Sequence, residues 1–552
     1  MDSIFNQLAI VLSLCSLLGL IVVKLRLPLV VGYLLAGVIL SAFMPGNLHE
    51  MPVFKFLPEL GIALILFLIG MELDLREIKS LGVPIIVGSL AQILISTLAG
   101  FAIAGLLGFT QVESVYMGLG LAFSSTIVII KLLIEKRELS SLYGKLALGM
   151  VLLEDLVAIL VLMGISVGSS VFATGLQNSM PIVMLILKAI GLFLLAYILS
   201  RFVLERMFDA VAKSVELLFL TAITWCFLFT TLAVWSGFSV VIGAFLAGVA
   251  IASSPYSIQI EGKVKPLRDF FLTLFFVYLG TEAHVGDFVT YWPAILAFTL
   301  CALIAKPIFV MLVLGAFGFR KHTFFHTAIS LSQISEFSLV VLLVGLNAGL
   351  VSPPTLSVMA AVAVFSMIIS SLAISQSNKL FRILHPFIGF FQHGKFTHEM
   401  EARSEEEAFD HIIIIGAHRV GGPIVNYLAK TKIPFLVLDF NPKVVQDLRE
   451  RGIKVIYGDI DDPEVLESIH LDKARLIIST AQDHSDNEFL LEEVKRRRIQ
   501  SKVIVRATDP DQEKELRKMG ADYVILPEKV SGDYLVNELK SHWPDLRFSG
   551  LE

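Results

Sequence analysis

The hydrophobic positions of this chain form long runs up to about residue 376 and much shorter groups beyond residue 395. A helix needs about 20 apolar residues to span a bilayer. By that measure the first part predicts about thirteen spans, over residues 6–23, 28–44, 53–71, 83–107, 113–134, 143–170, 181–200, 214–234, 236–253, 267–283, 290–317, 323–347 and 354–376. We therefore expect an all-helical membrane domain over residues 1–376, a linker over 377–409 and a second domain over 410–552.

The basic residues between these spans gather in alternate loops, and the opposite loops carry almost none, with Lys55 the main exception. The basic loops contain Lys24, Arg26, Arg76, Lys79, Lys131, Lys136, Arg137, Arg201, Arg206, Lys213, Lys263, Lys265, Arg268, Arg320 and Lys321. Such loops stay on the cytoplasmic side of a membrane. With an odd number of spans, the pattern predicts that the N-terminus lies outside and the C-terminal domain lies in the cytoplasm.

The composition agrees with a membrane protein. The chain is 55% hydrophobic and 17% charged, with a mean hydropathy of +0.78. Soluble domains carry about 25% charged residues. The net charge of -5 argues against a nucleic-acid partner. Cys15, Cys226 and Cys301 lie in apolar segments, and their spacing suggests neither a disulfide framework nor a metal site.

Short motifs of the first half recur, in the same order, in the second half. The pairs are GYLLAGV at 32–38 with GAFLAGV at 243–249, GME at 70–72 with GTE at 280–282, and FSST at 123–126 opposite QISE at 333–336. An odd number of predicted spans separates the copies, so they face opposite ways. Inverted repeats of this kind are typical of secondary transporters, whose substrate site lies near the midplane between the repeats.

The last of these pairs places small polar residues in the middle of two predicted spans. The residues are Ser124, Ser125, Thr126, Gln333, Ser335 and Glu336. Irregular backbone is tolerated at membrane depth where it lines a cavity, so we expect both helices to be broken there. The alternative is that the hydroxyls bond back to their own helices, and the matched register of the two clusters favours the break.

Two adjacent acids, Glu154 and Asp155, lie within the aliphatic run VLLEDLVAILVL. An ionised acid at that depth is costly unless it is paired or hydrated. Lys306, also within a span, is available as a partner, and an entirely structural ion pair is the alternative. Burial favours the protonated acid and a nearby ammonium favours the carboxylate, so one site can hold a proton or a cation. We expect the monovalent cation and the proton at Asp155, and Glu154 as the partner of Lys306.

These residues carry a family resemblance. The segments LPLVVGYLLAGVIL, GIALILFLIGMELD, AFSSTIVI, EDLVAI and SQISEFSLVV resemble the monovalent cation:proton antiporter-2 family, which includes the Kef-type potassium efflux systems. The resemblance implies a homodimer, thirteen helices and crossed, broken fifth and twelfth helices. It also implies an ion-binding acid at Asp155 and a lysine at Lys306. Glu154 matches neither the aspartate of the sodium antiporters nor the glutamine of the Kef type, so the choice between potassium and sodium stays open.

The part after residue 409 alternates short hydrophobic strands with helices, as HIIIIG, GGPIVNYLAK and PFLVLD illustrate. This order predicts a doubly wound parallel sheet, an α/β Rossmann-like domain. It resembles the regulator-of-potassium-conductance (RCK) domain, also called the TrkA N-terminal domain. The resemblance implies a regulatory nucleotide.

The expected phosphate-binding turn departs from the G-x-G-x-x-G pattern, in which the middle glycine lets the backbone approach a pyrophosphate. The candidate nucleotide-binding residues are Gly416, His418, Arg419, Gly421, Asp439 and Asp459. A histidine replaces the middle glycine, while a helix N-terminus and an arginine still suit a phosphate. This favours AMP or no ligand at all over a dinucleotide such as NAD(H).

Taken together, the sequence predicts a transporter and not an enzyme. We expect a homodimer in membrane lipid that exchanges potassium or sodium for protons by alternating access, without a catalytic cofactor, and that is gated by its RCK domain. An RCK-gated cation channel is the alternative, although the chain has no T-V-G-Y-G filter motif. A nucleotide-dependent membrane oxidoreductase is the third hypothesis, and no haem, flavin or quinone motif supports it.

Overall fold

The computed structural model describes residues 4–25, 27–43, 52–72, 82–136, 138, 141–174, 188, 191–212, 214–252, 254–391, 410–431, 433–458, 460, 465–466 and 469–542. The chain divides into two compact units. One comprises residues 1–129, 148–310 and 328–376, and the other comprises 130–147, 311–327 and 377–552. The domain boundaries expected from the hydrophobic pattern stay a prediction.

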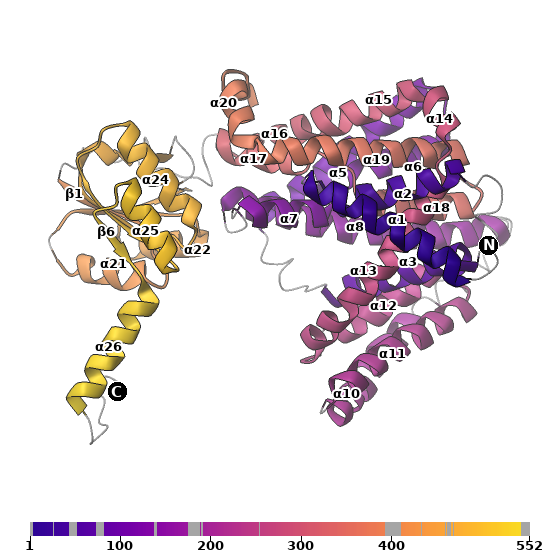
Figure 1. The fold of residues 1–552 in the computed structure, drawn as a ribbon, viewed down its shortest axis with the longest axis horizontal. Coiled ribbons are helices and arrows are strands. Elements are labelled where there is room, and N and C mark those ends of the chain that lie inside the picture. The colour runs from indigo at the N-terminus through magenta and orange to yellow at the C-terminus, as the bar shows by residue number, and fades with distance from the viewer. Residues whose placement is uncertain are drawn as a thin grey trace. The chain divides into compact units, whose positions relative to one another are not determined.

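Helices build the part of the chain that precedes residue 376 (Figure 1). The uninterrupted ones are α1 (Ile4–Lys24), α2 (Leu29–Phe43), α3 (Pro52–Glu72), α5 (Val83–Leu106), α8 (Leu142–Thr174), α10 (Glu205–Val211), α11 (Val215–Trp235), α12 (Val240–Ala252), α13 (Ser257–Glu282), α14 (Val285–Thr290) and α19 (Pro353–Ser375), and a short π-helix, η1 (Ser200–Leu204), precedes α10. Among the described residues, seven helical segments are long and apolar enough to cross a membrane. Of the predicted span at 181–200, the structure describes residues 188 and 191–200, and these are helical.

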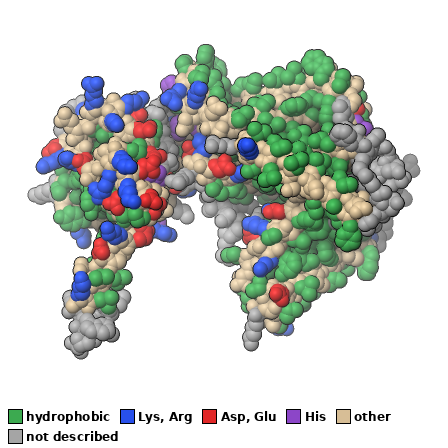
Figure 2. Space-filling model, viewed as in Figure 1, with side chains coloured by type: hydrophobic (Ala, Val, Ile, Leu, Met, Phe, Trp, Pro, Cys, Tyr) green, Lys and Arg blue, Asp and Glu red, His purple; other side chains and the backbone are tan. Residues whose placement is uncertain are grey.

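The outer surface of these helices is apolar. Leu90, Leu94 and Leu98 follow one face of α5 and are 48%, 60% and 58% exposed. Figure 2 shows hydrophobic side chains over the helical part of the chain, whereas lysine, arginine, aspartate and glutamate crowd the visible face of the sheet domain. Exposed leucines along a helix match a hydrocarbon environment, so the surface agrees with the multi-span membrane protein that the sequence predicted.

Among the described residues, three long helical segments depart from α-helical geometry near their middle. The first consists of α6 (Gln111–Ala122) and α7 (Thr126–Lys136), and the second of α17 (Lys321–Ser330) and α18 (Glu336–Asn347). Residues between the halves are extended, as at Phe123 (φ −85°, ψ 143°) and Ser335 (φ −90°, ψ 160°). The third runs from α15 (Trp292–Leu300) through a π-helix, η2 (Cys301–Ala305), into α16 (Lys306–Ala316).

The repeated glycine motifs lie where helices cross. A methyl group on Gly37 of α2 would lie 2.7 Å from the Cα atom of Gly280 on α13, and one on Gly248 of α12 would lie 2.9 Å from the Cα atom of Gly70 on α3. Glycine allows such close packing of helices in membranes. The repeat offset relates Gly37 to Gly248 and Gly70 to Gly280, so the two crossings are equivalent by the inverted repeat.

The chain after residue 409 folds into a six-stranded parallel sheet in the order β3-β2-β1-β4-β5-β6. The strands are β1 (His411–Ile415), β2 (Phe435–Asp439), β3 (Val455–Tyr457), β4 (Ala474–Ser479), β5 (Lys502–Arg506) and β6 (Tyr523–Ile525). The helices are α21 (Gly421–Ala429), α22 (Pro442–Glu450), α24 (His484–Arg496), α25 (Pro510–Met519) and α26 (Pro527–His542). This is the doubly wound arrangement that the sequence predicted, with its switch point between β1 and β4.

Candidate functional site

The two adjacent acids of α8 point to different partners. Glu154 is completely buried, and its Oε2 atom accepts a hydrogen bond of 2.6 Å from the backbone N–H of Ser124. Asp155 is half-buried, and its Oδ2 atom accepts a hydrogen bond of 2.7 Å from the Thr126 hydroxyl. Neighbouring residues on a helix point about 100° apart. The geometry therefore separates an inner acid, Glu154, from a more accessible one, Asp155.

Both acids lie at the N-terminus of α7. Helix α6 ends at Ala122 and α7 begins at Thr126. The first backbone N–H groups of α7 therefore have no carbonyl partner within a preceding helical turn. The partial positive charge of a helix N-terminus favours an anion there. The break at Ser124 thus gives the carboxylates of α8 a polar environment within an apolar helix bundle.

The lysine predicted to pair with Glu154 is also completely buried. Lys306 and Glu154 attract each other electrostatically, and the Lys306 ammonium donates a hydrogen bond of 3.2 Å to the carbonyl oxygen of Gln333. The backbone N–H of Lys306 bonds to the carbonyl of Cys301, five residues earlier, which is π-helical geometry. Pro307 explains this widened turn, because its ring clashes with the carbonyl four residues before it in an α-helix.

The break in the second interrupted helix brings further polar groups to the same region. Gln333 is completely buried, and among the described residues its side-chain amide has no hydrogen-bond partner. A hydroxyl–carbonyl hydrogen bond of 3.2 Å joins Ser124 to Leu331, so the two breaks touch. Buried polar groups normally find a partner in protein or water, so the Gln333 amide can bind a water molecule at this break.

The remaining predicted residues of the second break surround its helix start. Glu336 is the first residue of α18 and is buried, and Ser335 caps that helix by accepting a hydrogen bond of 3.1 Å from the N–H of Phe337. The Ser125 hydroxyl is a hydrogen-bond partner of the Glu336 carboxylate. The structure thus brings all six polar residues of the predicted breaks together with Glu154, Asp155 and Lys306.

Helix α5 adds a polar stripe that the sequence reading missed. Ser89, Gln92 and Ser96 are completely buried on one face of α5. The Gln92 side-chain amide donates to the carbonyl of Ala122 (3.0 Å), the last residue of α6. Gln92 thereby satisfies a carbonyl that the break leaves without a helical partner. The spacing of three, four and seven residues places them on one face, and this periodicity was the signal available in the sequence.

A second cluster surrounds the helix that follows the membrane domain, α20 (Ser377–Ile388). Phe381 is buried against the rings of His322 (5.3 Å between centroids), Phe325 (5.5 Å) and His326 (5.6 Å). The cluster also contains hydrogen bonds from Lys136 to Ser377 (2.9 Å) and between His326 and Asn378 (2.8 Å). Because Lys136 ends α7 and the histidines lie on α17, α20 is fastened to one half of each broken helix.

The candidate nucleotide turn joins β1 to α21. Gly416 adopts φ +84°, a conformation that favours glycine, and a side chain on Gly421 would collide with the Gly416 carbonyl. The Asp439 carboxylate accepts hydrogen bonds of 2.7 Å from the backbone N–H groups of Ala417 and Asn441. Asp439, one of the candidate nucleotide-binding residues, therefore holds the turn in shape.

The two large side chains of this turn lie at the surface. His418 and Arg419 are exposed, and the His418 carbonyl accepts the N–H of Gly422 in the first turn of α21 (2.9 Å). The sixth predicted residue, Asp459, lies outside the described residues. The turn thus retains a helix N-terminus and a basic side chain, which together suit a phosphate.

Comparison with known families decides the identity of the membrane domain. Residues 9–377, more than half of the chain, match the profile described as "Sodium/hydrogen exchanger, transmembrane". The chain belongs to the sodium/hydrogen exchanger family. Residues 412–527 match the TrkA-N domain. The chain is a cation/proton antiporter with a C-terminal TrkA-N domain, as its sequence predicted.

Several known proteins are similar to this chain. The chain is 27% identical over 550 residues to YbaL of Escherichia coli (strain K12), covering 94% of each chain. It is 28% identical over 525 residues to the glutathione-regulated potassium-efflux system protein KefC of Enterobacter sp. (strain 638), covering 94% of this chain and 81% of that one. The sodium proton antiporter MjNhaP1 from Methanocaldococcus jannaschii covers 68% of this chain and 97% of its own at 19% identity and a TM-score of 0.48.

Proposed function

We propose that this chain exchanges potassium or sodium for protons by alternating access, and that Asp155 binds the cation and the proton in turn. The observation that carries this proposal is the pair of opposed breaks, at 123–125 and 331–335, beside half-buried Asp155. Inverted repeats with broken helices at midplane are the construction in which alternating access is known to operate.

The exchange follows from competition at one carboxylate. An ionised Asp155 attracts a monovalent cation, and the Thr126 hydroxyl beside it offers a second oxygen. A protonated Asp155 loses the charge that holds the cation, so cation and proton exclude each other. Because the site opens to one side at a time, a cation released to one side is replaced at Asp155 by a proton from that same side. The site then reorients, releases the proton to the other side and binds a new cation there.

Glu154 and Lys306 have a different role in this scheme. Both are completely buried and attract each other. The Ser124 N–H donates to one oxygen of Glu154, and the Lys306 ammonium donates to the Gln333 carbonyl. A buried pair of opposite charges at the two breaks holds the broken helices together when Asp155 is neutral. We infer that the pair sets the geometry of the site and that Asp155 carries the substrate.

The C-terminal domain is the proposed regulator. Helix α20 lies at the start of the predicted linker, residues 377–409, and its contacts with α7 and α17 offer a route from the C-terminal domain to both breaks. A ligand regulates only if it binds two states of the protein unequally. We propose a mononucleotide such as AMP at the turn from Gly416 to Gly421, and a homodimer in a bacterial inner membrane with this domain in the cytoplasm.

Proton flux in proteoliposomes tests the exchange. An outward gradient of potassium or sodium is imposed on vesicles that contain the full chain, and internal pH is followed with a dye, with the membrane potential clamped or varied. We expect a saturable acidification with one or both cations. A passive cation leak that does not saturate and moves no protons in exchange would support the channel instead of the antiporter.

A further inference from the structure

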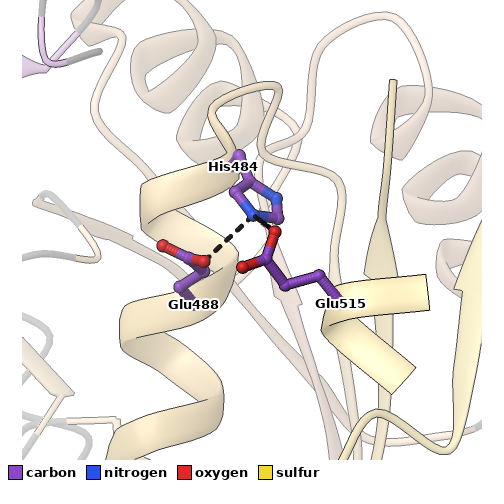
Figure 3. A group of neighbouring side chains, drawn as sticks. All are labelled: His484, Glu488 and Glu515. Atoms are coloured by element: carbon purple, nitrogen blue, oxygen red, sulfur yellow. Dashed lines mark hydrogen bonds and ion pairs between the residues drawn. The ribbon is translucent and has the colours of Figure 1, made fainter. Parts of the chain in front are cut away.

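Three ligand-type side chains come together in the C-terminal domain, and none of them is among the residues proposed for nucleotide binding. His484 begins α24, Glu488 follows one turn later on the same face, and Glu515 reaches across from α25 (Figure 3). The His484 Nε2 atom lies 3.0 Å from Glu488 Oε1 and 3.2 Å from Glu515 Oε2. The three ligand atoms all lie within 4.8 Å of one another.

The charges of this group are not balanced. Two carboxylates face a single imidazole nitrogen, which carries at most one proton. Within the part of the chain that the structure describes, neither Glu488 nor Glu515 has a lysine or arginine at ion-pair distance. Other acids on the same helices do have one: Glu493 pairs with Arg496 and Arg497, Glu513 with Arg517, and Asp511 with Lys514.

We propose that His484, Glu488 and Glu515 bind a divalent transition-metal ion of the zinc class. Zinc sites place ligand atoms about 2.0–2.2 Å from the metal in a tetrahedron, which puts neighbouring ligand atoms about 3.4 Å apart. The observed 3.0 and 3.2 Å need only a small outward movement of the two glutamates. An imidazole nitrogen with two carboxylates suits zinc, manganese or cobalt, whereas magnesium and calcium prefer oxygen alone.

The surrounding backbone holds the three residues in place without the metal. The side-chain amide of Asn487 donates hydrogen bonds of 3.1 Å to the carbonyls of Ala481, Asp483 and Arg506, which ties the start of α24 to β5. Asp509 caps α25 by accepting from the N–H groups of Asp511 and Gln512 (2.9 Å each). A preorganised scaffold of this kind favours binding over an induced rearrangement.

Burial assigns a different part to each ligand. His484 is 7% exposed, Glu488 33% and Glu515 60%. The histidine is therefore the fixed ligand, and the glutamates close over the ion from the surface, where water completes the coordination. Such an ion would cross-link α24 to α25 next to the loop after β4, where the Thr480 hydroxyl bonds to the Gly416 carbonyl (2.9 Å).

Metal binding to the purified full chain tests the proposal without any transport assay. The untagged protein is stripped with a chelator, and Zn²⁺ binding is measured by calorimetry, with Co²⁺ absorption as a spectroscopic check and Mg²⁺ as a negative control. We expect one Zn²⁺ per chain. Glu488→Gln, Glu515→Gln and His484→Gln should each weaken binding at least about tenfold, while Glu492→Gln, an exposed acid one turn further along α24, should leave it unchanged.

Thermal unfolding separates the metal site from an ordinary ion-pair cluster. A metal that binds only the folded state raises the melting temperature, and the gain grows with the logarithm of the ratio of free metal to Kd. Zn²⁺ should therefore stabilise the wild type and the Glu492→Gln protein but not Glu515→Gln. Because Glu515 is the most exposed of the three, its substitution should leave the fold intact. Equal Zn²⁺ affinity in the wild type and Glu515→Gln, or no stoichiometric binding to the wild type, would overturn the proposal.

Discussion

At the scale of single residues, the site depends on two carboxylates that differ in burial and not in chemistry. Glu154 is completely buried, accepts a hydrogen bond from the Ser124 backbone and is attracted by the Lys306 ammonium. Asp155 is half-buried and bonds to the Thr126 hydroxyl. The sequence could predict both acids, since charges in an apolar run stand out. It could not predict the hydrogen bond from the Ser124 backbone, because that contact depends on where the helix breaks.

Removing the buried lysine tests the role of Glu154. Lys306→Ala leaves a carboxylate buried without its opposite charge, and breaking one partner of such a pair costs about 3–5 kcal/mol. We expect a lower melting temperature in detergent. The double variant Glu154→Gln with Lys306→Met removes both charges of the pair and should recover most of the loss. A double variant as unstable as Lys306→Ala would contradict the pairing.

Asp522 gives a pH-dependent prediction in the C-terminal domain. The Lys502 ammonium (2.6 Å) and the N–H of Val503 (2.9 Å) hold the pKa of the Asp522 carboxyl below its usual range. A lowered pKa in the folded state stabilises the fold above the unfolded pKa, about 4, and this contribution is lost as pH falls toward the folded value.

The corresponding variant should therefore lose stability at neutral pH. Because the pair is exposed, we expect Asp522→Asn to weaken the domain by no more than about 1 kcal/mol at pH 7, with the difference fading below about pH 4. Hydrogen exchange of β5 and β6 in the full chain measures it. Asp533→Asn, another exposed acid, is the control, and a difference from wild type that stays constant from pH 3 to pH 7 would count against the assignment.

At the scale of elements, the fold brings each polar cluster to a helix end. The breaks after α6 and α17 lie at the small polar residues where the sequence predicted them. Ser and Thr side chains can bond to nearby backbone groups and so compete with the helical hydrogen bonds. The π-helix before Lys306 and the polar stripe of α5 were not predicted. The π-helix depends on a local response to Pro307, and the serines of α5 blend into an otherwise apolar segment.

Helix α20 should be held mainly by one aromatic side chain. Phe381 is 8% exposed between the histidines of α17, whereas Phe387 on the same helix is 74% exposed. Removing a buried phenylalanine costs about 3–5 kcal/mol. Phe381→Ala should therefore speed hydrogen exchange of α20 by at least about tenfold, and Phe387→Ala should not. Equal exchange in the two variants would mean that α20 does not dock through Phe381.

At the scale of the whole molecule, the inverted repeat relates two helix crossings as well as two breaks. Gly37 meets Gly280, and their repeat equivalents Gly248 and Gly70 meet each other. The repeat was visible in the sequence as three motif pairs. Only the structure shows that a motif of the first pair contacts a motif of the second pair at each crossing. The metal-type cluster was hidden for a similar reason, because Glu515 lies on a different helix from His484 and Glu488.

The symmetry makes a paired stability prediction. Gly37→Ala and Gly248→Ala each place a methyl group against backbone of the crossing helix, and overpacking typically costs about 1–3 kcal/mol. We expect both variants to lower the melting temperature by similar amounts. Gly105→Ala on α5, where the added methyl meets nothing within 4 Å, is the control. A clear loss for one crossing and none for the other would argue against equivalent packing.

The central claim is that one carboxylate, Asp155, carries both cation and proton. The most direct test compares wild type with Asp155→Asn in proteoliposomes, with proton flux driven by a potassium or sodium gradient. Asparagine keeps the size of the side chain and can still pair with Thr126, so the protein should fold and elute as the wild type does. We predict proton flux indistinguishable from empty vesicles. Cation-coupled proton flux retained by a folded Asp155→Asn protein would contradict the account.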